Sequence, residues 1–93
     1  MLKGTTSSEY GIIKNILKAF PHKFYAYGSR VRGDFTPLSD LDLGVKGKIS
    51  PDELTTLKEE FDRSSLPYIV NITLLDNIDE NFYNLIKKDL VEL

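Results

Sequence analysis

Hydrophobic residues recur along the chain with two different spacings, one typical of helices and one typical of strands. The helical spacing predicts a first helix that is capped by Ser7 or Ser8 and ended by Pro21. It predicts two further helices, over residues 51–63 and 79–86. The apolar positions that define these three helices are Ile12, Ile13, Ile16, Leu17, Phe20, Leu54, Leu57, Phe61, Phe82, Leu85 and Ile86.

Strand patterns fill the segments between these helices. An aromatic run predicts a strand over residues 23–27, strict alternation predicts one over 41–45, and a β-branched run predicts one over 68–75. A short helix over residues 29–31 follows the first strand and ends at Gly33. The connections are long enough for parallel strands with helices over the sheet. We therefore expect an α/β (α+β) fold, with a small mixed sheet of about three to four strands covered by helices.

The ends of the elements carry signals of their own. Ser50 and Glu53 have the spacing of a capping box, which sets the start of the second long helix. Residues 1–6 show no periodic pattern and are expected to form a loose terminus, while residues 91–93 are too few to assign. We expect residues 1–93 to form a single domain, because this length suits one hydrophobic core.

The composition narrows the class of protein. The chain is 41% hydrophobic and 28% charged, which is ordinary for a globular domain. A net charge of −2 disfavours binding to a nucleic-acid backbone. The absence of cysteine excludes disulfides, thiolate zinc sites and a cysteine nucleophile. No apolar run reaches the roughly 18 residues of a membrane span, and the polar beginning lacks a signal-peptide core. We expect a cytoplasmic protein without a membrane partner.

Gly28 and Ser29 form the first candidate chemical site. They stand directly after a predicted strand and open a short helix, where backbone N–H groups point outward and attract anions. Gly28 allows the backbone to approach a phosphate closely, and the hydroxyl of Ser29 adds a donor. Alone, a Gly-Ser pair after a strand is usually an ordinary turn.

Asp40 and Asp42 form the second candidate. Two positions apart on a predicted strand, they face the same side, while Leu41 and Leu43 face the core. The two carboxylates repel each other unless a cation lies between them, and Mg²⁺ prefers such oxygen ligands. An isolated Asp-x-Asp is usually a solvated strand edge. Following a phosphate-binding turn in this order, the pair indicates a metal–triphosphate site.

The segment from Tyr27 to Leu43 resembles the signature of the minimal nucleotidyltransferase (MNT) proteins of the DNA polymerase β superfamily. The pattern is Gly-Ser, a short spacer that ends near Gly33, and then Ser-Asp-x-Asp-Leu. The resemblance extends over nearly the whole chain, because residues 66–72 resemble the family's third strand and residues 80–86 its last helix.

The resemblance implies a nucleotidyltransferase that uses ATP with Mg²⁺ or Mn²⁺. Family members transfer AMP to a tyrosine of a helical HEPN protein, and the two form a toxin–antitoxin pair in which the MNT protein is the antitoxin. By resemblance, Gly28 and Ser29 hold the triphosphate and Arg30 adds a phosphate contact. Asp40 and Asp42 bind the metal ions. A homo- or hetero-oligomer is compatible with this role.

Asn71 departs from the family pattern. It occupies the position of a third catalytic carboxylate on the third strand, within Val70-Asn71-Ile72. An amide offers a carbonyl oxygen but has no charge and cannot accept a proton as a base. Asp76 does not replace the carboxylate, because strand alternation places it on the opposite face from residue 71.

Two other functions are therefore alternatives to AMP transfer to a protein partner. The first is a catalytically impaired binding module that neutralises its partner by contact, which Asn71 favours. The second is a nucleotidyltransferase that acts on RNA ends or on a small molecule, although the acidic charge balance argues against RNA.

Overall fold

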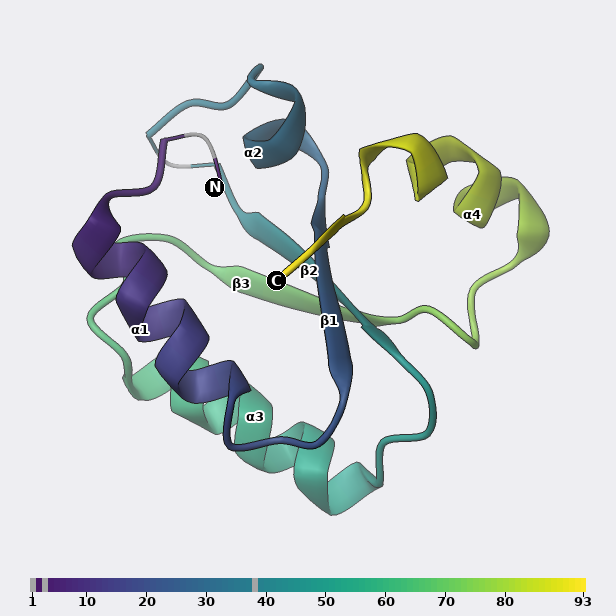
Figure 1. Ribbon diagram of the computed structural model, residues 1–93, viewed down its shortest axis with the longest axis horizontal. Coiled ribbons are helices and arrows are strands. Elements are labelled where there is room, and N and C mark those ends of the chain that lie inside the picture. The colour runs from purple at the N-terminus through teal and green to yellow at the C-terminus, as the bar shows by residue number, and fades with distance from the viewer. Residues whose placement is uncertain (1, 3, 38) are drawn as a thin grey trace.

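The computed structural model describes residues 2, 4–37 and 39–93. Helices and strands alternate along most of this chain, as Figure 1 shows. The elements in chain order are α1 (Ser7–Leu17), β1 (Lys23–Tyr27), α2 (Ser29–Arg32), β2 (Leu41–Lys46), α3 (Pro51–Arg63), β3 (Val70–Leu74), α4 (Glu80–Ile86), the 3₁₀ helix η1 (Lys87–Asp89) and β4 (Val91–Glu92). None of the described helices is long and apolar enough to cross a membrane.

The four strands form one mixed sheet in the order β3-β2-β1-β4, which confirms the predicted fold class. β2 and β3 are parallel and are joined by α3, a connection of the length that parallel pairing requires. β1 pairs antiparallel with both β2 and β4. The β1–β2 connection contains only the four-residue α2, which does not carry the chain back across the sheet. The unassigned residues 91–93 supply the edge strand β4.

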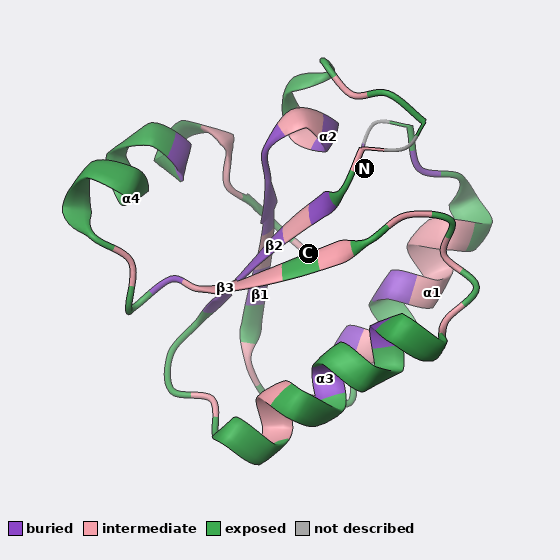
Figure 2. Ribbon diagram, turned by 180° about the vertical axis from the view of Figure 1, so that it is seen from behind, coloured by how far each residue is buried: buried purple, intermediate pink, exposed green. Residues whose placement is uncertain are grey.

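One face of the sheet is covered by α1 and α3, which lie side by side (Figure 1). Leu41, Leu43 and Val45 of β2 are fully buried on this face, and Figure 2 shows much of β2 in the colour of buried residues. They pack against Ile13 of α1 and Leu57 of α3 in one core cluster. The predicted alternation of β2 is therefore confirmed, and it leaves the Asp40 and Asp42 side chains on the opposite face.

The opposite face is covered only in part, by α4. Ile86 of α4 packs with Tyr27 and Leu75 in a second, smaller cluster. Phe82 and Leu85, two of the three apolar positions that define this helix, are 37% and 70% exposed. They stay exposed because α4 is a seven-residue helix that meets the sheet along one side only. The rest of this face stays open beside the carboxylates.

The beginning of the chain is held more firmly than its pattern suggests. Thr6, and not Ser7 or Ser8, caps α1, because only Thr6 stands three residues before Glu9 and can form a capping box with it. Leu2 and Thr5 are buried, so the expected loose terminus does not hold for them. Residues 1 and 3 of that segment lie outside the described residues. α1 ends at Leu17, earlier than predicted.

The predicted capping box of α3 is confirmed and has a consequence for pH. Glu53 accepts a hydrogen bond from the Ser50 backbone and lies 3.2 Å from Nε2 of His22. The Ser50 hydrogen bond, with a smaller contribution from His22, lowers the pKa of Glu53. A carboxyl group whose pKa falls on folding stabilises the protein above its unfolded pKa, and this stabilisation disappears as the pH falls through the folded value.

Glu53→Gln is therefore expected to lower the free energy of unfolding at pH 7 and to have little effect at pH values well below about 4, where glutamate is protonated. Urea unfolding of both proteins at pH 7 and pH 3 measures the difference. Glu59→Gln, exposed on the same helix, is the matched control. An equal loss of stability at both pH values would contradict a role for the Glu53 charge.

Candidate nucleotide and metal site

The turn between β1 and α2 places Gly28 directly against the carboxylate strand. Tyr27 and Asp42 are paired across β1 and β2, so the next residue, Gly28, reaches the Asp42 side chain. Gly28 has a φ of 86°, and a Cβ at this position would lie 2.5 Å from Oδ2 of Asp42. A glycine is therefore required both by the backbone and by the close carboxylate. Ser29 begins α2 beside it, as predicted.

Asp40, Asp42 and Asn71 meet on the open face of the sheet. Asp42 and Asn71 are neighbours in the parallel β2–β3 register. Nδ2 of Asn71 donates hydrogen bonds to Oδ2 of Asp40 at 3.0 Å and to Oδ1 of Asp42 at 3.2 Å. The amide nitrogen faces the carboxylates because only its N–H groups can satisfy two acceptors. The structure thus brings together all three side chains that the sequence assigned to the catalytic centre.

This donor set fits a divalent cation. Two carboxylates that share one amide nitrogen are close enough to share one positive partner, and both are accessible, with Asp40 exposed and Asp42 half-buried. Hard oxygen ligands of this kind suit Mg²⁺. No group of three or more His, Cys, Asp or Glu side chains fit to hold a metal occurs in the described part of the chain. Asp40 and Asp42, whose carboxylates offer the charged oxygens of this set, are the residues that would hold the ion.

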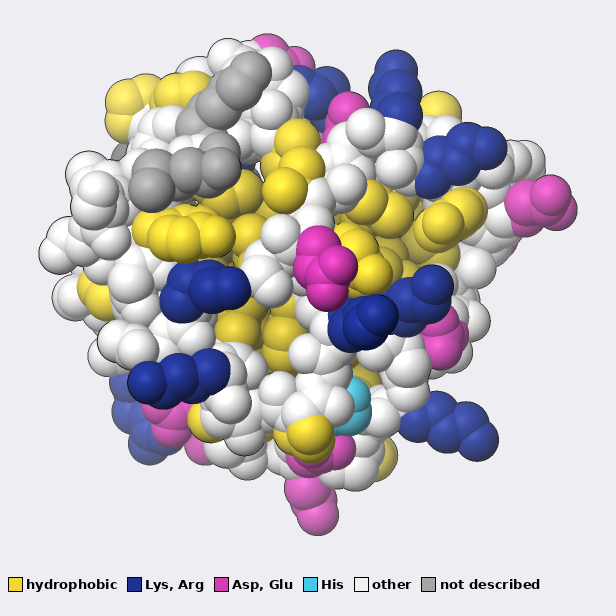
Figure 3. Space-filling view, in the orientation of Figure 1, with side chains coloured by type: hydrophobic (Ala, Val, Ile, Leu, Met, Phe, Trp, Pro, Cys, Tyr) yellow, Lys and Arg dark blue, Asp and Glu magenta, His cyan; other side chains and the backbone are white. Residues whose placement is uncertain are grey.

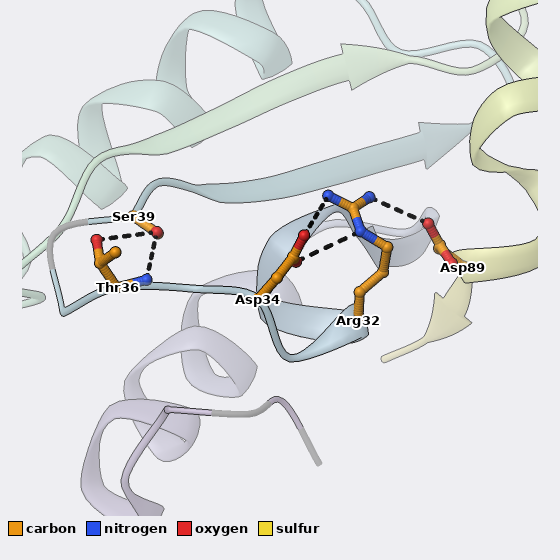
Figure 4. Close-up of polar contacts among 5 residues, drawn as sticks. All are labelled: Arg32, Asp34, Thr36, Ser39 and Asp89. Atoms are coloured by element: carbon orange, nitrogen blue, oxygen red, sulfur yellow. Dashed lines mark hydrogen bonds and ion pairs between the residues drawn. The ribbon is translucent and has the colours of Figure 1, made fainter.

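Polar contacts that the sequence pattern does not predict stabilise the loop before Asp40 (Figure 4). The Ser39 hydroxyl accepts a hydrogen bond from the backbone N–H of Thr36 at 2.7 Å, which closes the turn that leads into β2. At the start of the loop, Arg32 forms ion pairs with Asp34 and with Asp89 of η1. The Ser of the Ser-Asp-x-Asp pattern thus shapes the backbone just before the first carboxylate.

Arg30 does not lie where the resemblance implied. Its side chain is buried, with 1% of the residue exposed, and its guanidinium donates to the backbone carbonyls of Gly4, Pro37 and Ser39. The expected phosphate contact is therefore corrected, because these carbonyls already use donors on all three guanidinium nitrogens. The sequence does not reveal this, since a four-residue helix has no period that distinguishes its inner from its outer side.

Aromatic side chains border the carboxylates on the side of α4. The Tyr27 hydroxyl forms a 2.8 Å hydrogen bond with Oγ1 of Thr73, and the Tyr27 ring meets Phe82 edge to face, with centroids 6.3 Å apart. Burial raises the pKa of the Tyr27 hydroxyl, the Thr73 hydrogen bond lowers it in part, and the Asp42 charge raises it again. Tyr27 thus remains protonated and acts as a wall of the site. Strand alternation could indicate its face but not its contact with α4.

Gly28→Ala is expected to damage both the fold and the site. The backbone conformation alone, with a φ of 86° and a ψ of −157°, costs an alanine about 1–3 kcal/mol, and the alanine Cβ displaces the Asp42 carboxylate. Gly47→Ala is the matched control, because Gly47 has a φ of 93° and no atom within 4 Å of an added Cβ. Titration with Mn²⁺ should show weaker binding in Gly28→Ala alone, whereas equal binding in both variants would contradict the contact with Asp42.

Known proteins similar to this chain are nucleotidyltransferases. Residues 12–92 match the family described as polymerase beta, nucleotidyltransferase. The chain is 36% identical over 86 residues to the "Probable protein adenylyltransferase MntA" of Haemophilus influenzae, covering 88% of this chain and 75% of that protein. A Sulfolobus solfataricus crystal structure, provisionally assigned as a nucleotidyltransferase, is 27% identical with a TM-score of 0.45, covering 88% and 72% of the two chains. The chain belongs to the polymerase beta nucleotidyltransferase family.

Proposed function

We propose that this nucleotidyltransferase domain binds ATP with Mg²⁺ and transfers AMP to a tyrosine hydroxyl of a protein partner. The observation that carries the proposal is the meeting of Asp40, Asp42 and Asn71 beside Gly28 on the open face of the sheet. The relative from Haemophilus influenzae, named a protein adenylyltransferase, supports a protein as the acceptor.

Each residue of the site has a distinct role in the proposed reaction. Gly28 leaves room for the Asp42 carboxylate beside the turn that would face the triphosphate, and the Asp40 and Asp42 carboxylates hold the cation. Bound Mg²⁺ supplies neutralisation of the triphosphate charge and polarisation of its α-phosphate. The acceptor oxygen forms a new bond to the α-phosphorus, the bond to the β-phosphate oxygen breaks, pyrophosphate leaves, and the tyrosine proton passes to solvent. Asn71 orients the two carboxylates but cannot take that proton.

The proposed partner is a helical protein of the HEPN type, which this chain would silence as the antitoxin of a toxin–antitoxin pair. This assignment follows from the family resemblance and is compatible with a protein acceptor. The net charge of −2 favours a protein over a nucleic acid. On the face that Figure 3 shows, Lys and Arg side chains are interspersed with Asp and Glu and form no continuous basic surface.

Asn71 supports a second candidate function, a binding module that neutralises the partner by contact. Its amide lies between the two carboxylates, at the position where the family has a third carboxylate. Unlike a carboxylate, the amide cannot accept a proton at neutral pH. In this case the nucleotide and the cation would bind, but the AMP moiety of ATP would not be transferred to the partner.

Incubation with ATP labelled on the α-phosphate, Mg²⁺ and the proposed HEPN-type partner separates the two functions. AMP transfer predicts label on the partner, loss of label when its acceptor tyrosine becomes phenylalanine, and loss in Asp40→Ala/Asp42→Ala. An unlabelled partner that nevertheless binds and is neutralised would establish the binding module instead.

A further inference from the structure

Arg30 is a buried charge at the point where three segments of the site meet. Only 1% of the residue is exposed, yet it lies next to Ser29 in the turn expected to hold the triphosphate. Its Nε donates to the carbonyl of Ser39, the residue directly before Asp40, at 3.0 Å. A second donor reaches the carbonyl of Pro37 at 3.3 Å in the same loop. One side chain thus connects the turn to the carboxylate strand.

The same guanidinium also contacts the approach to β3. Its central carbon lies 3.8 Å from the centroid of the Tyr68 ring and 5.6 Å from that of Phe35. Tyr68 precedes Asn71 by three residues, and its hydroxyl forms a 3.2 Å hydrogen bond with Thr5. The β-branched run predicts a strand from residue 68, but β3 begins only at Val70. Tyr68 instead lies against Arg30.

A buried charge of this kind calls for a reason. Removing a guanidinium from water is costly, and the hydrogen-bond acceptors of Arg30 are three neutral carbonyls and not a carboxylate. An apolar side chain would fill the same volume without that cost. What it could not do is hold the Ser39 backbone, the α2 turn and the Tyr68 ring at fixed distances from one another, for which a planar, rigid fork is suited.

We propose that Arg30 is a positioning residue, which sets the spacing between the Gly28–Ser29 turn and the Asp40–Asp42 carboxylates so that one nucleotide-bound cation can reach both. The inference rests on the proposed function, because it assigns these two elements to one metal–nucleotide complex. Displacements of about 1 Å in such a site can cost about 10²-fold in rate, so the spacing has to be held by something more rigid than the loop after α2, in which Asp34, Thr36 and Pro37 are exposed.

Arg30→Lys tests the proposal, because lysine keeps the charge but has neither the fork nor the planar face. The measurement is Mn²⁺ binding by electron paramagnetic resonance, with and without a non-hydrolysable ATP analogue, at a temperature where circular dichroism shows the variant folded. We expect Mn²⁺ affinity in the presence of the analogue to fall about tenfold or more. Arg32→Lys, an exposed arginine of the same helix, should stay within about twofold.

Tyr68→Leu provides a second route if Arg30→Lys does not fold. It removes the ring beneath Arg30 and leaves the guanidinium in place, so the same loss of affinity is expected. Tyr10→Leu, which removes a half-buried aromatic packed on the same core from α1, controls for general loss of stability. A drop in Tyr68→Leu that exceeds the one in Tyr10→Leu supports positioning.

Three results would overturn the inference. The first is a folded Arg30→Lys variant with the Mn²⁺ affinity of the wild type, and the second is equal Mn²⁺ affinity in the two tyrosine variants. The third is failure of both Arg30→Lys and Tyr68→Leu to fold, which would show that Arg30 contributes to stability alone.

Failure of the proposed function would give a different result. A wild type that binds Mn²⁺ with the ATP analogue but labels no partner refutes the proposed AMP transfer and leaves the positioning result standing.

Discussion

Exchanging Asn71 for aspartate is expected to raise AMP transfer by about 10²-fold or more. The substitution adds a carboxylate next to Asp40 and Asp42, whose oxygens lie 3.0 and 3.2 Å from the present amide nitrogen. It thereby supplies both a charged ligand for the cation and a group able to accept the tyrosine proton. Initial rates of label transfer to the partner in the wild type and in Asn71→Asp measure the effect.

The same exchange should carry a cost in stability when no metal is present. Two hydrogen bonds are lost and three like charges are brought together, so Tm without metal should fall and Mg²⁺ should restore it. Asn77→Asp adds the same charge after the end of β3 and is the matched control. If Asn71→Asp binds metal more tightly but transfers AMP no faster, the third carboxylate is not what limits this chain.

Exchanging Asp42 for asparagine is expected to lower AMP transfer by about 10²–10³-fold while leaving the fold intact. Asp42 is the central member of the site, since it contacts both Gly28 and Asn71. Asparagine has the same size and keeps an oxygen for the Asn71 amide, but it removes the charge that holds a cation. Rates of label transfer and thermal unfolding, compared in the two proteins, measure the two effects separately.

Stability should move in the opposite direction to activity in this variant. Without metal, relief of repulsion between two carboxylates should leave Tm of Asp42→Asn at or above that of the wild type. Asp62→Asn, an exposed position of α3, controls for the loss of one negative charge. A lower Tm together with unchanged transfer would mean that Asp42 belongs to the scaffold and not to the site.

Most of the fold follows from local signals in the sequence. The strand over residues 23–27 and the helix over residues 51–63 have the predicted bounds, because each combines one clear period with a clear stop or cap. β4 could not be predicted, since two residues have no period and depend on pairing with β1. The sequence pattern assigns the cap of α1 to Ser7 or Ser8 and not to Thr6, because several hydroxyl residues are adjacent there and only the distance to Glu9 selects Thr6.

The candidate site also contains residues that local sequence patterns predict and residues whose position depends on contacts between distant parts of the chain. Gly28 and Asp42 stand in recognisable local patterns, and the alternation of β2 fixes the face on which the carboxylates lie. Asn71 joins them through the parallel register of β2 and β3, which the family resemblance supplied and a single strand pattern could not. The environment of Arg30 depends on Gly4 and Tyr68, far away in the chain, so no local period indicates that this arginine is buried.

The central claim is that Asp40 and Asp42, beside Gly28, form a site for a cation and a nucleotide together. Calorimetric titration of the wild type and of Asp40→Ala/Asp42→Ala with ATP, each with and without Mg²⁺, tests it most directly. The account predicts that the wild type binds ATP only when Mg²⁺ is present and that the double variant binds none. ATP binding that needs no Mg²⁺, or that persists unchanged in the double variant, would contradict it.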